Sequence, residues 1–300
     1  MKKRQLGKGG DQVSIIGLGS WPIGGGMGTV DERQAIATIH AALDVGVSLI
    51  DTAQSYRTSE ITIGKALAGG KRSKVFLASK ASSDYSRRGI RSSIEDTLKA
   101  LDTDYLDLYQ IHSWNSQYPI EESMAEMAQL VKEGKTRFVG VSNFSVEQMK
   151  RAWAASPFAS TQPAYNVFDR DIEQDVIRFC SQQGIGILAH SVLAKGLLTG
   201  KYGPDHVFPA DDERSHMPRF QGRQFAEYLK RADALTVVAN EVGCSLVQLA
   251  IAWVVRIPQV ACALVGAKTP AQVAEQVAAA EIVLNHEVTA RIEDIASGRL

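Results

Sequence analysis

The feature of this 300-residue chain that most restricts its fold is a regular alternation of short apolar runs with longer segments of helical period. The runs are rich in β-branched residues, as buried parallel strands are. Successive runs end about 30 residues apart, which is the length of one strand–helix unit. The expected strands are residues 14–19, 47–53, 75–80, 106–112, 138–143, 161–166, 186–192 and 261–267.

The segments between these runs have the spacing of amphipathic helices. In residues 32–46, Ala35, Ile36 and Ile39 fall on one stripe and Gly46 follows as a terminator. Eight such units predict a parallel sheet that closes into a (β/α)8 TIM barrel, a single domain over residues 1–300. A doubly wound open sheet is the alternative, but GLGSWPIGGG only loosely resembles the glycine-rich nucleotide turn it requires. The same helical period is present in 90–102, 120–135, 172–184, 232–243 and 245–255.

One interval departs from the regular spacing. The chain between the seventh and eighth expected strands is much longer than the other units, so it must contain an insertion with extra helices. Residues 198–225 open it and are rich in Gly, Pro, His and charge, which predicts a long surface loop.

Composition excludes several classes of partner. Lys plus Arg and Asp plus Glu number 33 each, and the resulting net charge of zero gives no broad attraction to nucleic acid or to an anionic membrane. The three cysteines are dispersed among apolar neighbours, which predicts neither a zinc site nor a disulfide framework. No signal-peptide run and no stretch of roughly 20 apolar residues is present. We expect a cytoplasmic protein, either a monomer or a small homo-oligomer, that binds neither nucleic acid nor membrane.

Polar residues recur where the expected strands end. Because the carboxyl ends of the strands meet at one rim of a barrel, these side chains should converge although they are far apart in sequence. They are Asp51, Lys80, His112, Ser142, Asn143, Gln162 and His190.

Four residues of this rim suggest a proton-transfer site. Asp51 and Lys80 come from adjacent strands and are expected to form a buried ion pair, a poor device for stability alone because desolvation is costly. Tyr56 follows Asp51, and an ammonium beside its phenol is expected to lower its pKa from about 10 toward neutrality. His112, on the next strand, is expected to hydrogen-bond a substrate oxygen. The set predicts a carbonyl polarised for attack by hydride.

Ordered motifs across the chain resemble the aldo-keto reductase superfamily. The resemblance runs from about residue 4 to residue 284 and is nearer to the bacterial sugar- and aldehyde-reducing members and the potassium-channel β-subunits than to the vertebrate aldose reductases. The motifs are LIDTAQSYRTSEITIGKAL (49–67), ASK (78–80), YQIH (109–112), GKTRFVGVSNF (134–144), QPAYN (162–166), GLLTGKY (196–202) and GAKTPAQVAEQ (266–276).

This resemblance implies roles for individual residues. Tyr56 would be the general acid, Lys80 would lower its pKa, Asp51 would hold Lys80, and His112 would orient the substrate. The cofactor would be NADP(H), with no metal required, and Lys268 would bind its 2′-phosphate together with a hydroxyl and a helix N-terminus. The implied cofactor residues are Ser20, Trp21, Asp51, Ser142, Asn143, Gln162, His190, Ser191, Leu193, Gly196, Lys201, Gly266, Lys268, Thr269, Gln272, Glu275 and Gln276.

The chain departs from the family pattern at several of these positions. Gln272 stands where many members have an arginine on the phosphate, and Gln276 replaces a common asparagine facing adenine. His190 stands where members often carry a tyrosine or tryptophan that stacks on the nicotinamide. Arg57 replaces a glycine common after the catalytic tyrosine. For the substrate pocket the sequence suggests Trp21, Tyr56, His112 and Trp114, and it does not name the substrate.

Two further classes of function remain as alternatives. One is a nicotinamide-binding regulatory subunit that resembles the potassium-channel β-subunits, which retain the same four residues. The other is a metal-dependent lyase or hydrolase, which would need carboxylates and histidines at metal-ligand spacing. Of the strand-end residues only Asp51 is a carboxylate, which argues against the metal enzyme.

Overall fold

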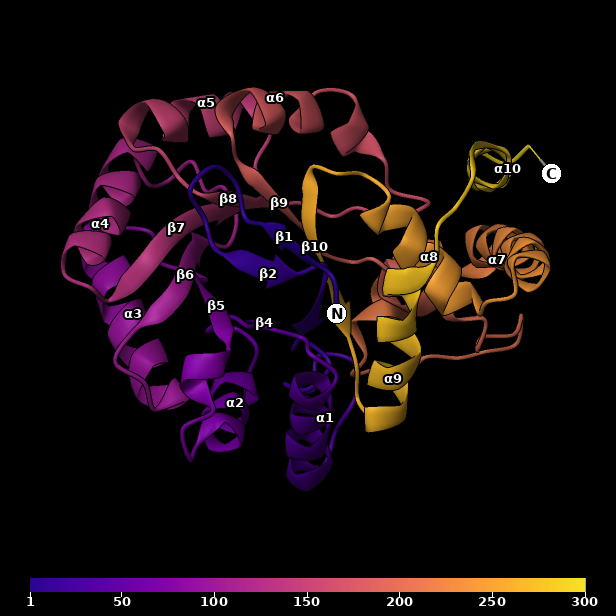
Figure 1. Ribbon diagram of the computed structural model, residues 1–300, viewed down its shortest axis with the longest axis horizontal. Coiled ribbons are helices and arrows are strands. Elements are labelled where there is room, and N and C mark those ends of the chain that lie inside the picture. The colour runs from indigo at the N-terminus through magenta and orange to yellow at the C-terminus, as the bar shows by residue number, and fades with distance from the viewer. Residues whose placement is uncertain (300) are drawn as a thin grey trace.

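Eight parallel strands close into a barrel in the computed structural model, which describes residues 1–299. The strands follow one another around the barrel in chain order, and the last pairs with the first. Figure 1 shows the helices arranged outside these strands. The strands are β3 (Ile16–Gly19), β4 (Leu49–Asp51), β5 (Phe76–Ala81), β6 (Leu106–Ile111), β7 (Thr136–Ser142), β8 (Ser160–Gln162), β9 (Gly186–Ala189) and β10 (Val260–Gly266).

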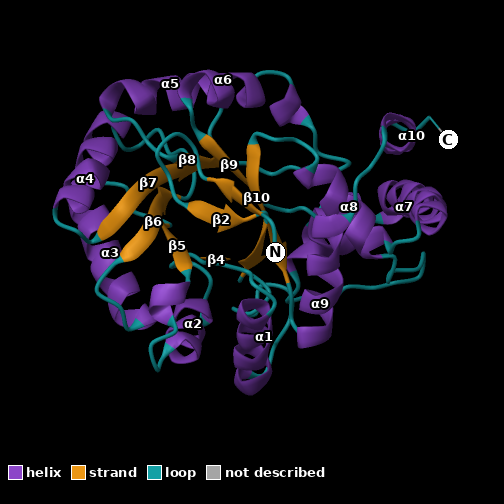
Figure 2. Ribbon diagram, viewed as in Figure 1, coloured by secondary structure: helices purple, strands orange, loops and turns teal. Residues whose placement is uncertain are grey.

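The helices form the outer layer around the barrel strands (Figure 2). Their apolar stripes pack on the strands, so most of the core lies between barrel and helices. They are α1 (Glu32–Asp44), α2 (Ser59–Leu67), α3 (Arg87–Leu101), α4 (Ile120–Lys132), α5 (Val146–Ala155), α6 (Val176–Gln183), α7 (Gly222–Val242), α8 (Leu246–Val255), α9 (Pro270–Ala278) and α10 (His286–Ala296).

The predicted barrel is confirmed, and several strand ends are shorter than expected. The ladder of β4 stops at Asp51, that of β8 at Gln162 and that of β9 at Ala189, because the chain turns into the rim loops at these points. Helices α2, α5 and α10 were not among the segments expected to be helical, although Ser145 and Gln148 form a capping box that marks the start of α5.

An N-terminal hairpin, absent from the sequence prediction, lies across one end of the barrel (Figure 1). It pairs β1 (Lys3–Gln5) with β2 (Gln12–Ser14) in antiparallel register. Leu6 and Val13 are fully buried and pack with Leu49, Leu108 and other residues of the barrel interior. The hairpin therefore completes the interior core at the end opposite the strands' carboxyl ends.

The insertion after β9 is not the simple surface loop that its composition predicts. It contains short 3₁₀ turns at Ala194–Thr199, Glu213–His216 and Pro218–Phe220. Phe208, Phe220 and Arg214 are buried. Aromatic contacts, such as the 5.2 Å between the ring centroids of Phe208 and Phe220, hold the segment against α7. A sequence rich in Gly, Pro and charge therefore still forms a small core of its own.

No single helix within residues 1–299 is both long enough and apolar enough to cross a membrane. Taken together across their 84° bend, α7 and α8 would meet that requirement by length and composition.

Candidate active site at the carboxyl ends of the strands

A buried ion pair joins the ends of two adjacent strands. The Nζ of Lys80, on β5, donates to Asp51 Oδ2 at 2.6 Å and to the Thr52 carbonyl at 2.9 Å. Lys80 is fully buried and Asp51 is nearly so. Burial acts to lower the pKa of Lys80, but the charges of Asp51 and Tyr56 outweigh it and raise this pKa above its ordinary value. The ammonium is thus retained although the Lys80 side chain is fully buried.

Tyr56 lies in the loop after β4 with its phenol directed toward this pair. Its hydroxyl is 3.5 Å from Lys80 Nζ, and its ring makes edge contacts with Trp21 at 5.0 Å and His112 at 5.7 Å between centroids. These contacts fix the phenol from three sides. Asp51, Tyr56, Lys80 and His112, which the sequence predicts to form a proton-transfer site, are therefore adjacent.

The expected lowering of the Tyr56 pKa is wrong as a net effect. Burial of the phenolate is the largest influence and raises the pKa of Tyr56; Lys80 opposes it, and Asp51 and Glu213 add to it. Because the Asp51 carboxylate offsets much of the Lys80 charge, the ammonium does not compensate for desolvation. Tyr56 therefore keeps its proton at neutral pH, which is the form that a general acid needs.

His112 follows β6 and is neutral in this environment. Burial, with smaller contributions from Lys80 and His190, lowers the pKa of His112 to about 3. Its Nδ1 lies 3.1 Å from Ser82 Oγ, and Nε2 has no hydrogen-bond partner among residues 1–299. The Ser82 hydroxyl lies nearer to Nδ1 than to its other acceptor, the Lys80 carbonyl at 3.4 Å. A hydroxyl that donates to Nδ1 leaves the proton on Nε2, which is then available as a donor.

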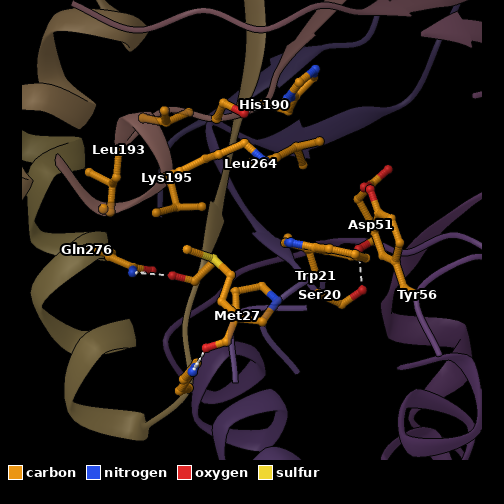
Figure 3. Close-up of a pocket in the computed structure, with 18 of the residues that line it drawn as sticks. Ser20, Trp21, Met27, Asp51, Tyr56, His190, Leu193, Lys195, Leu264 and Gln276 are labelled. Atoms are coloured by element: carbon orange, nitrogen blue, oxygen red, sulfur yellow. Dashed lines mark hydrogen bonds between the residues drawn. The ribbon is translucent and has the colours of Figure 1, made fainter. Parts of the chain in front are cut away.

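A cavity of about 640 Å³ opens beside Tyr56 and continues along the ends of β7–β10 toward α9. Figure 3 shows Tyr56 and Gln276 at opposite ends of it, with Trp21 and Leu264 between them. This volume is in the range of cofactor sites. The residues assigned to the cofactor by resemblance all line it, with the exception of Thr269.

Amide and hydroxyl groups from β7 and β8 form one part of the wall. Ser142 Oγ donates to the Gln162 carbonyl at 2.9 Å, and Gln162 Nε2 donates to Asp51 Oδ1 at 2.8 Å. Gln162 Oε1 accepts no hydrogen bond from residues 1–299. The wall therefore presents a free acceptor whose position is set by the ion pair.

The segment after β9 has an unusual backbone. Ser191, Ala194 and Lys195 have φ of 56°, 48° and 54°, and Gly196 has φ of 102°. Left-handed conformations are strained for residues with a side chain and gather at functional sites. This segment lines the cavity where the resemblance expects the cofactor.

Three cations gather at the far part of the cavity. Burial lowers the pKa of Lys268, and the charges of Lys201 and Arg214 lower it further. Lys268 Nζ donates to the Met27 carbonyl, and Arg214 is held by Asp212 at 2.6 Å. Asp212 offsets part of this charge, and the positive charge that remains can attract an anionic group.

Thr269 and Trp114 lie elsewhere than the sequence suggested. The Thr269 hydroxyl caps the N-terminus of α9 by accepting from Gln272 N, and its side chain does not line the cavity. Trp114 packs on Phe144 at 5.3 Å and under Arg151, away from the cavity wall. In both cases local contacts occupy the side chain.

The structure adds wall residues that sequence reasoning missed. Trp21 Nε1 donates to Glu213 Oε1 at 3.1 Å, and Lys195 Nζ donates to the same oxygen at 2.7 Å. Glu213 and Arg214 belong to the insertion, and no local pattern marks their approach to the rim. Met27, Lys195, Val247 and Leu264 also line the cavity.

Comparison with known proteins places this geometry in a family. The model of the Aldo/keto reductase family matches residues 15–297. The chain belongs to this family. Aldo-keto reductase YhdN of Bacillus subtilis (strain 168) is 43% identical over 277 residues, which cover 88% of this chain and 84% of that protein.

Solved aldo-keto reductases have the same architecture. The glycerol dehydrogenase AKR11B4 from Gluconobacter oxydans superposes with a TM-score of 0.89 at 36% identity, covering 99% of this chain and 95% of that chain. An aldo/keto reductase from Klebsiella pneumoniae in complex with NADP and acetate gives 0.79 at 30% identity, covering 99% and 96%. Because aldo-keto reductases are oxidoreductases, this protein belongs to that class of enzyme. In residues 1–299, no three His, Cys, Asp or Glu side chains are grouped as metal ligands.

Proposed function

We propose that this protein is an NADP(H)-dependent reductase of an aldehyde, ketone or sugar carbonyl, or the dehydrogenase of the corresponding alcohol. The observation that carries the proposal is the Tyr56 hydroxyl, 3.5 Å from a buried Lys80 and facing the cavity. Two relatives support it, since one is named a glycerol dehydrogenase and another is described in complex with NADP.

The residues present fit an NADP(H) cofactor. The free acceptor Gln162 Oε1, with Ser142 and Asn143 beside it, complements a carboxamide, which offers two N–H donors and one acceptor. The cations Lys201, Arg214 and Lys268 complement phosphate groups at the other part of the cavity. The fit therefore extends over both ends of a dinucleotide.

The chain's own residues would move a single proton. When bound, NADPH supplies the hydride for the carbonyl carbon. Tyr56 donates its proton to the carbonyl oxygen, and Lys80, held by Asp51, stabilises the phenolate that results. His112 Nε2 donates a hydrogen bond to the same oxygen, and Trp21 bounds the substrate space beside Tyr56. In alcohol oxidation the proton returns to Tyr56.

A substrate screen tests the proposal. The purified protein is incubated with NADPH or NADH and a panel of neutral aldehydes, ketones and aldoses, and with NADP+ or NAD+ and the matching alcohols. We expect oxidation of NADPH, followed at its absorbance, with at least one activated aldehyde. Binding of NADPH without turnover of any substrate would instead favour a cofactor-binding regulatory protein.

Cofactor preference provides a second test. Replacing Lys268 with Ala should weaken NADPH binding about 10- to 100-fold, because hydrogen bonds to a charged phosphate contribute about 1.5–3 kcal/mol. Binding of NADH, which lacks the 2′-phosphate, should change little. Titration of cofactor fluorescence gives both dissociation constants, with Lys99→Ala on the exposed face of α3 as a matched control. Equal losses for the two cofactors would remove the phosphate assignment.

The pH profile of reduction should be flat across neutrality. His112, whose pKa is lowered to about 3, is already neutral above that pH, and Tyr56, whose pKa is raised, keeps its proton until strongly alkaline pH. The acid form of Tyr56 is the active form, so kcat should fall only on the alkaline side, above the ordinary tyrosine pKa of about 10. A falling limb centred near pH 7 in kcat at saturating NADPH would contradict this assignment.

A further inference from the structure

His190, at the end of β9, makes two hydrogen bonds through its ring. Nε2 lies 2.8 Å from Asn143 Oδ1, and Nδ1 lies 2.9 Å from Ser191 Oγ. The stacking role that the resemblance implies for this position uses only the face of a ring. Stacking therefore does not account for the two hydrogen bonds that the ring nitrogens of His190 make.

The donors and acceptors in this chain of contacts follow from the groups themselves. Asn143 Nδ2 donates to the His112 carbonyl and to Ser142 Oγ, both at 3.1 Å, so Oδ1 must face His190. A carbonyl oxygen only accepts, so His190 Nε2 carries the proton. Burial lowers the pKa of His190 to about 4, so the ring is neutral and Nδ1 accepts from the Ser191 hydroxyl. One tautomer satisfies every contact.

This chain of contacts fixes an amide that would otherwise have two orientations. Asn143 has φ of 58°, and its backbone N–H donates to the Gln162 carbonyl at 3.2 Å. Rotation of its side-chain amide by half a turn would exchange Oδ1 and Nδ2 with little change of shape. Only the observed orientation directs Oδ1 to His190 and leaves a second lone pair for a ligand.

We propose that His190 is a positioning residue that holds Asn143 Oδ1 as an acceptor for the carboxamide amino group of the nicotinamide. With Gln162 Oε1, the wall then offers one acceptor for each N–H of that group. This inference rests on the proposed function, because it assumes a nicotinamide at this end of the cavity. It assigns His190 a contribution through hydrogen bonding rather than through ring stacking.

Two substitutions separate the two contributions. His190→Gln removes the ring and keeps an N–H donor that reaches Asn143, whereas His190→Phe keeps a ring and removes the donor. We expect the Kd of NADPH to stay within about threefold of wild type in the Gln variant and to rise about tenfold in the Phe variant, a loss of the size expected when a buried acceptor is left unpaired. Tight binding by the Phe variant with weak binding by the Gln variant would overturn the inference in favour of stacking.

A ligand lacking the amino group makes the test specific. In 3-acetylpyridine adenine dinucleotide phosphate a methyl group replaces the carboxamide NH₂. Wild type and His190→Gln should both prefer NADP+ over this analogue. The preference should be clearly smaller in His190→Phe but should not vanish, because Gln162 Oε1 still accepts one N–H of the amino group. An unchanged preference in the Phe variant would refute the role assigned to Asn143.

Two controls keep the outcomes distinct. Adenosine 2′,5′-bisphosphate lacks the nicotinamide half, so its Kd should be the same in wild type and both variants, and a parallel loss would show that the Phe variant disturbs the whole site and would count against the inference. Ser191→Ala keeps the ring and removes the Nδ1 partner, and it should weaken NADPH in the same direction by about threefold. Because Ser191 also lines the cavity, the loss should be smaller for the 3-acetylpyridine analogue than for NADP+, and equal losses would count against the inference. This variant tests the inference if His190→Phe does not fold. Failure of the wild type to bind NADPH would refute the proposed function itself.

Discussion

Replacing Tyr56 with Phe is expected to lower kcat for aldehyde reduction by about 10²- to 10⁴-fold, the range that a positioned general acid contributes. The substitution removes the hydroxyl that lies 3.5 Å from Lys80 Nζ and keeps the ring contacts with Trp21 and His112. Because most groups proposed to bind the cofactor lie at the ends of β7–β10 and on α9, the Kd of NADPH should stay within about twofold of wild type. Stopped-flow or steady-state oxidation of NADPH measures the first quantity, and fluorescence titration measures the second.

The control for this prediction is Tyr118→Phe, which removes a hydroxyl from a tyrosine that does not line the cavity. Its kcat should match that of wild type. Reduction by Tyr56→Phe at the wild-type rate would show that another group, such as His112, donates the proton.

The second large effect concerns the ion pair. Lys80→Met should lower the free energy of unfolding by about 3–5 kcal/mol, because it leaves the Asp51 carboxylate buried without its cation. Turnover should also be lost, since the phenolate of Tyr56 would form beside a carboxylate alone. Urea denaturation gives the stability and NADPH oxidation gives the activity.

The double variant Asp51→Asn/Lys80→Met separates stability from catalysis. Removing both charges should restore most of the lost stability, because neither group then remains buried and unpaired. Activity should not return. A double variant that is as unstable as Lys80→Met would contradict the account of the pair, and one that is fully active would remove Lys80 from the reaction.

The barrel itself could be predicted because each unit carries a local signal. The apolar run of residues 75–80 and the amphipathic stripe of residues 32–46 depend only on neighbouring residues, and eight such units have few ways to pack. The polar residues at the strand ends, such as Asp51 and His112, could be placed at one rim for the same reason. The hairpin that buries Leu6 and Val13 was missed because its strands have only three residues each and too little periodicity to detect.

Other features of the site were decided only by the tertiary structure, because they depend on contacts between residues that are distant in sequence. The pKa of Tyr56 is raised because burial exceeds the attraction of Lys80 once Asp51 is paired with it, and this balance requires the packed site. His190 bonds Asn143 across 47 positions of the chain, and Glu213 reaches Trp21 from the insertion.

The sequence alone determined the repeating strand–helix units and the order of polar groups around the rim, because both arise from residues close together in the chain. Which side chains are buried, which charges cancel and which amide faces a ligand depend on desolvation and on contacts that form only when the barrel closes.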